Sequence, residues 1–125
     1  MKDKLNNLIK LLLELHKSLL DLERAEYEKN NGVISNNYEY FQLVVNSDDF
    51  RWLRSLSELI ASLDSESEKD ELEHRTIKAI LEKLQSIFQV NNDEEFSKRY
   101  SYFLEHKANL VDLQTKIITN ISECK

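Results

Sequence analysis

The sequence predicts an all-α fold, a compact bundle of four to six helices joined by short polar turns. The 125 residues include no proline and one glycine, whereas the many tight turns of an all-β fold depend on those residues. The chain is also rich in Leu, Glu and Lys, which favour helices. A chain of this length predicts one domain, residues 1–125, whose core needs neither metals nor disulfides.

The first expected helix covers residues 4–29. Leucines alternate there at spacings of three and four, so they share one side of the helix. These leucines are Leu5, Leu8, Leu12, Leu15, Leu19 and Leu22. Ile9, Leu13 and His16 widen the apolar face, which is typical of a bundle core. A single bundle of this size leaves part of so wide a face uncovered, so a homodimer through this helix is one interpretation.

Three further helices are expected, and capping residues predict where each begins. Asn-Asn-Gly at 30–32 predicts the end of the first helix, because Asn and Gly tolerate a left-handed cap. Asn36 followed by Glu39 has the spacing of a capping box and predicts a short helix over 36–45. Ser47 as N-cap predicts the third helix over 48–64, and Ser65 with Glu68 predicts the fourth over 68–88.

The last expected helical stretch covers residues 93–121, with Asn92 and Glu95 as its capping pair. Its apolar residues follow helical spacing, and Lys107 interrupts them. This predicts a break or kink near residues 105–109, although one uninterrupted helix stays an alternative.

Charge and composition exclude several classes of function. The formal net charge of −6 opposes binding to nucleic acid and to anionic membranes, both of which reward clustered Lys and Arg. No stretch approaches the roughly 18 apolar residues that a membrane span needs. Cys124 is the one cysteine, so no internal disulfide forms and a reducing cytosol fits. A single glycine excludes a phosphate-binding P-loop. The sequence therefore predicts a soluble cytoplasmic protein.

Motifs for catalysis and metal binding are incomplete. Glu71 and His74 have the Glu-x-x-His spacing of di-iron bundles, but that chemistry needs a second such pair, which the chain lacks. Residues 36–64 faintly suggest a DNA-binding helix-turn-helix, but two aspartates open the would-be recognition helix, where phosphates would repel them. We therefore predict no catalytic residue, no metal, no cofactor and no nucleic-acid partner.

Arg51 and Arg54 flank the single tryptophan, Trp52. Arginine beside tryptophan can stack on the ring or hold a carboxylate. We interpret these arginines as packing residues. The alternative is a pocket for a small ligand or a metal between the first and third expected helices. Its lining residues would be His16, Glu23, Tyr27, Trp52 and Arg54.

Two segments resemble motifs of a family of small, uncharacterised all-helical bacterial proteins, HK-x-L-x-D-x-E-R-x-x-Y-E and F-x-W-L-R-x-L-S-x-L-I. The matching residues are His16, Lys17, Leu19, Asp21, Glu23, Arg24, Tyr27, Glu28, Phe50, Trp52, Leu53, Arg54, Leu56, Ser57, Leu59 and Ile60. The resemblance covers roughly residues 15–64 and implies a fold class but no activity. Members often carry a proline where this chain has Ser55, which puts a kink there in question.

The two motifs lead to a hypothesis of contact between helices one and three. Both polar groups border apolar stripes, so we expect Glu23 to pair with Arg54, with Tyr27, Trp52 and Ser57 around them. The function that fits best is a small cytosolic, non-enzymatic interaction or scaffold module. Its partner would be another protein or a second copy of the chain.

Overall fold

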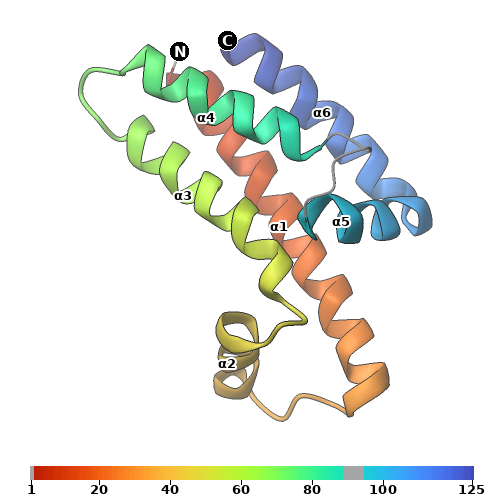
Figure 1. The fold of residues 1–125 in the computed structure, drawn as a ribbon. Helices are drawn as coiled ribbons and strands as arrows, with labels where there is room; N and C mark the ends of the chain where they lie inside the picture. Colours follow the sequence, from red (N-terminus) through yellow and green to blue (C-terminus); the bar gives the residue numbers. More distant parts are fainter. Residues whose placement is uncertain (1, 89–94) are drawn as a thin grey trace.

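The computed structural model describes residues 2–88 and 95–125, and this part of the chain is all-α, as the sequence predicts. Its elements are six α-helices, which are labelled in Figure 1, and one 3₁₀ helix: α1 (Lys2–Asn31), α2 (Asn37–Asn46), η1 (Arg51–Leu53), α3 (Arg54–Ser67), α4 (His74–Ile87), α5 (Glu95–His106) and α6 (Ala108–Cys124). No helix within these residues is long and apolar enough to cross a membrane.

Four helices, α1, α3, α4 and α6, form a ring around the core. α1 packs along both α3 and α6, and α4 joins these two on the far side. Neighbours in the ring run antiparallel, so the two chain ends lie close together (Figure 1). The side chains of Asn7 on α1 and Asn120 on α6 are joined there by a hydrogen bond of 3.0 Å.

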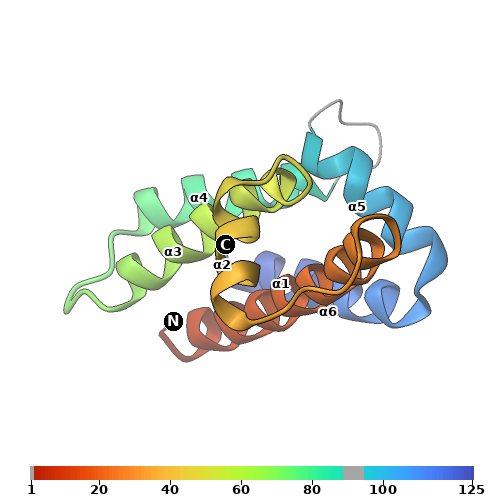
Figure 2. The same ribbon diagram turned by 90° about the horizontal axis from the view of Figure 1, so that it is seen from below.

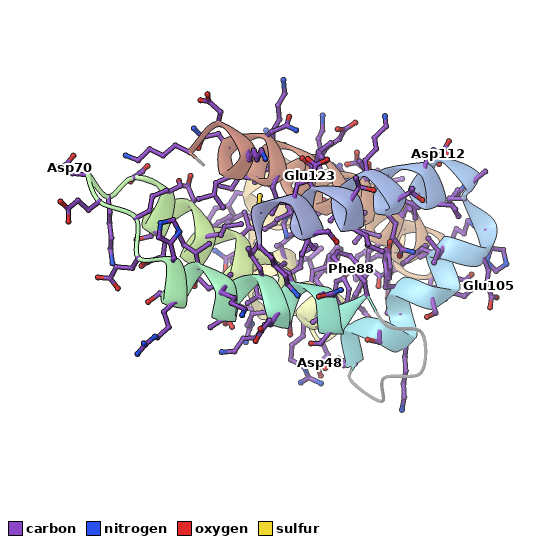
Figure 3. All side chains as sticks on the ribbon, turned by 90° about the horizontal axis from the view of Figure 1, so that it is seen from above. Asp48, Asp70, Phe88, Glu105, Asp112 and Glu123 are labelled. Atoms are coloured by element: carbon purple, nitrogen blue, oxygen red, sulfur yellow. The ribbon has the colours of Figure 1, made fainter. Side chains whose placement is uncertain are left out.

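The leucine stripe of α1 is the centre of the core. Its first five leucines, Leu5 to Leu19, are completely buried. Leucines and isoleucines of α3, α4 and α6 cover them, and Phe88 lies among the side chains in the middle of Figure 3. Burying a leucine side chain contributes about 1.5–3 kcal/mol, so this stripe supplies much of the free energy of folding.

The carboxyl-terminal half of α1 extends beyond the ring and carries the remaining elements. There α1 contacts η1 and α5, and α2 packs against η1 at the lower end of the view in Figure 1. The ring of Phe50, just before η1, lies 6.1 Å from that of Tyr40 on α2 and 6.0 Å from that of Tyr27 on α1. Aromatic contacts therefore attach α2 to the end of the bundle.

The predicted signals at the ends of α1 and α2 are confirmed. Gly32 has a φ of 84°, the left-handed conformation that glycine adopts without strain, and its N–H donates to the Glu28 carbonyl at 3.1 Å. The Asn36 side chain accepts the N–H of Glu39 at 2.8 Å. The predicted break in the last helical stretch is present as well, because Lys107 has extended backbone between α5 and α6.

The start of the third helix differs from the prediction. Ser47 Oγ accepts the N–H of Asp49 at 3.2 Å and so caps a turn, and the regular helix begins only at Arg54. The intervening residues turn Phe50 and Trp52 into the interior, where 1% and 4% of their surfaces are exposed. Burial of these two rings sets the local path of the backbone in place of the capping signal.

The predicted boundary between the third and fourth helices is wrong. α3 continues to Ser67, whose hydroxyl donates to the Asp64 carbonyl at 2.7 Å inside the helix, and α4 begins at His74. The predicted cap, Ser65, thus lies within the last turn of α3 as an ordinary helical residue. The predicted cap at Asn92 falls outside the described residues.

Candidate functional site

The most buried charged side chain of the described chain belongs to Glu23 on α1, with 3% of the residue exposed. Trp52 Nε1 of η1 donates to its Oε1 at 2.8 Å. Arg99 of α5 donates from Nε to Oε1 at 2.9 Å and from Nη2 to Oε2 at 2.8 Å. These three residues, named the Glu23 cluster, join α1, η1 and α5.

Aromatic rings surround the guanidinium of Arg99. Its central carbon lies 4.9 Å from the ring centroid of Tyr102 and 4.8 Å from that of Phe103, within the range of a cation–π contact. The Trp52 ring stacks on Phe103 at 5.9 Å. The hydrogen bonds to Glu23 raise the pKa of Arg99. The arginine is therefore charged and bidentate, the geometry that favours recognition of a carboxylate.

The predicted pair between Glu23 and Arg54 is wrong, because Arg99 binds this carboxylate. Arg54 Nη2 donates instead to the carbonyl of Val45 at 3.0 Å, at the carboxyl end of α2. The last carbonyls of a helix have no partner within it, so Arg54 acts as a cap for α2. The expected neighbourhood of Glu23 is correct for Trp52, which donates to it directly.

Arg99 is the site residue that sequence reasoning missed. It follows Phe96 by three positions and precedes Phe103 by four, so it borders the aromatic face of its helix. A cation at the edge of an apolar face was a usable signal for a buried ionic partner. The sequence could not choose among the cations, because that choice depends on how α5 crosses α1.

The five predicted ligand-binding residues do not line one pocket. Glu23 and Trp52 meet in the cluster, whereas Tyr27 packs on the ring of Phe50. His16 and Arg54 line a different pocket of about 260 Å³ beside α2. Burial lowers the pKa of His16.

A polar pocket of about 310 Å³ opens in front of the Glu23 cluster, and acidic residues line its mouth. Arg51 binds two of them, Asp48 at 3.0 Å and Glu95 at 3.5 Å. Both arginines beside Trp52 therefore make structural contacts. Within residues 2–88 and 95–125, no group of three His, Cys, Asp or Glu has the geometry to hold a metal. The Glu23 carboxylate accepts one hydrogen bond from Trp52 and two from Arg99, so the cluster acts as a structural link between α1, η1 and α5.

Apolar side chains are exposed on α2 and on α1. Tyr38, Phe41 and Val45 lie on one side of α2 with 74%, 61% and 44% of their surfaces exposed. We name these three residues the α2 ridge. Leu13 on α1, 52% exposed, lines an apolar groove of about 310 Å³ together with Ile60 and Ala61 of α3, named the α1/α3 groove.

Two features of the molecule are thus candidates for function, the saturated Glu23 cluster and the uncovered apolar surface. Comparison with protein-family models, with curated proteins and with solved structures finds no match for this chain. The uncovered surface is the feature with unused binding capacity, because its side chains face solvent while those of the cluster already have partners.

Proposed function

We propose that this protein is a small cytosolic, non-enzymatic interaction module that binds another protein chain through the α2 ridge and the α1/α3 groove. The exposed apolar face of α2 is the observation that carries the proposal. A cytosolic location is supported by Cys124, a buried free thiol.

The residue pattern of α2 explains why the ridge needs a partner. Six of its ten residues are apolar or aromatic, and Tyr40, Leu43 and Val44 pack against the core. At 100° per residue, the ridge continues this inward face around the helix, so the apolar arc spans more than half the circumference. A helix that is apolar over so wide an arc is normally covered on both flanks. The described residues of the chain cover only one flank.

Site-specific photo-crosslinking tests this proposal in cells that produce the protein naturally. A photoreactive residue at position 41 should give one discrete protein adduct upon irradiation, because the ridge is in contact with its partner. The matched control carries the same residue at position 111 on α6, where Val111 is 46% exposed but belongs to neither ridge nor groove. Equal adducts from the two positions, or none from position 41, would contradict the proposal.

A further inference from the structure

The α2 ridge and the α1/α3 groove form one continuous surface. Val45 of the ridge lines the pocket beside α2 together with His16, and His16 also lines the groove. Figure 2, seen from the end at which α2 lies, shows α2 in front of α1 and the start of α3. Resting on the proposed function, we infer that the partner is a second copy of this chain. The two copies are related by a two-fold axis, and the ridge of each enters the groove of the other.

The shape of the surface supports a two-fold arrangement. In a two-fold interface the same patch of surface is buried on both copies. If residue i of the first copy contacts residue j of the second, then residue j of the first copy contacts residue i of the second. A convex ridge beside a concave groove satisfies this condition. The two-fold rotation that places the ridge of the first copy in the groove of the second also places the ridge of the second copy in the groove of the first. The aromatic Phe41 at the middle of the ridge is the side chain best suited to fill an apolar groove of about 310 Å³.

The exposed area is the amount that a stable dimer needs. An aromatic side chain buries about 150–250 Å² when it is covered, so the exposed fractions of Tyr38, Phe41, Val45 and Leu13 amount to roughly 400 Å² of apolar surface. A standard interface takes about 800 Å² from each partner, a little over half of it apolar. The ridge and Leu13 therefore supply about the apolar area of one half of such an interface.

The groove carries charge of both signs. Asp64 of α3 is among its lining residues, and Lys10 and Lys17 precede and follow Leu13 by three and four positions on α1. Glu39, the one charged residue of α2, accepts the N–H of Ser35 through its carboxylate at 3.2 Å. The apolar contact between ridge and groove, and not a pairing of charges, therefore carries the inference.

Sedimentation velocity over a range of concentrations tests the inference on the full chain. The wild type should sediment as a dimer that dissociates on dilution. Phe41→Asp on the ridge and Ala61→Glu in the groove should each sediment as a folded monomer, since both residues are exposed. Tyr38→Asp is the second ridge variant, and Val111→Asp, an equal change on α6, should leave the dimer intact. Cooperative unfolding by circular dichroism verifies that each variant is folded.

Mixing the two monomeric variants gives the decisive measurement. A Phe41→Asp chain retains its groove and an Ala61→Glu chain retains its ridge, so the mixture can form one of the two contacts. A mixed dimer should appear, weaker than the wild-type dimer by at least tenfold, although neither variant dimerises alone. If Ala61→Glu alone stays dimeric, or if mixing restores nothing, the ridge–groove arrangement is wrong.

The outcome also separates this inference from the function on which it rests. If the wild type is monomeric at all concentrations while position 41 crosslinks to a different protein, the second copy is wrong and the interaction module stands. If the wild type is monomeric and position 41 gives no adduct, both proposals fail.

Discussion

Removal of Arg99 is the most informative test of the Glu23 cluster. In Arg99→Met, the aliphatic side chain keeps much of the packing on Phe103 but leaves the carboxylate of Glu23 with one hydrogen bond, from Trp52. Only 4% of the Glu23 side chain is exposed, so water replaces the lost donors incompletely. The opposite change, Glu23→Gln, leaves an amide that still accepts from Trp52. It also leaves an Arg99 side chain that is 34% exposed, so that its guanidinium can be hydrated.

These exposures predict an asymmetry between the two variants. Breaking a buried ion pair by removing one partner costs about 3–5 kcal/mol of unfolding free energy, and we expect Arg99→Met to cost about 3 because the pair is partly open to solvent. Glu23→Gln should cost only about 1–2 kcal/mol, the range for a hydrogen-bond change without a stranded charge. A domain of this size has about 5–15 kcal/mol in total, so the first loss is large.

Urea unfolding followed by circular dichroism measures both costs. With a slope of about 1–3 kcal/mol per molar urea, Arg99→Met should lower the midpoint by about 1–3 M. Lys98→Met, an exposed neighbour on α5, is the control and should change stability by less than about 0.5 kcal/mol. In a double-mutant cycle, Glu23 should couple to Arg99 and be additive with Arg54. An Arg99→Met variant as stable as the Lys98→Met control would refute the buried-pair reasoning.

Three further predictions concern α1 and α2. Burial lowers the pKa of His16 below its ordinary 6.5, so the folded state binds fewer protons than the unfolded chain. The free energy of unfolding should therefore fall as the pH drops below about 6.5. Urea midpoints measured across this range should fall less in His16→Gln than in the control His106→Gln. Leu12→Glu should unfold the chain because Leu12 is completely buried, whereas Leu13→Glu should give a folded monomer by sedimentation. Arg54→Met should speed amide hydrogen exchange in α2 but not in the four-helix ring, since it removes only the hydrogen bond to the carboxyl end of α2.

Much of the architecture could be predicted from local sequence. The periodicity of the α1 leucines identified the centre of the core, and Gly32 and Asn36 marked helix ends because their backbone and side-chain chemistry acts within a few residues. The capping signal at Ser65 failed because the Ser-x-x-Glu pattern also occurs inside helices, and α3 continues through Ser65 to Ser67. The stripe and the flank of the α1 face differ in burial, since Leu12 of the stripe is completely buried and Leu13 of the flank is 52% exposed.

The partner of Glu23 could not be predicted, because it lies 76 positions away in the sequence. Pattern and spacing placed Glu23 and Trp52 beside apolar faces, and they do meet. Which cation reaches a carboxylate across helices depends on the crossing of α5 over α1, and no local signal encodes that geometry. The exposed ridge was missed for a related reason. The sequence of a short apolar helix predicts a buried element, and which of its faces is left exposed depends on the neighbouring helices.

The segment from Phe50 to Arg54 connects the two candidate features. Its alternate residues point to three places: Phe50 contacts the rings of α1 and α2, Trp52 donates to Glu23, and Arg54 caps α2. The Glu23 cluster thereby fixes the start of α3 and, through the same segment, the position of the ridge. A polar cluster in this place determines geometry more than it adds stability. The free-energy cost of removing two charges from water offsets most of the Coulombic attraction between them. Its role in the proposed module is to hold the ridge at a fixed angle beside the groove, which lowers the entropy lost when a partner docks.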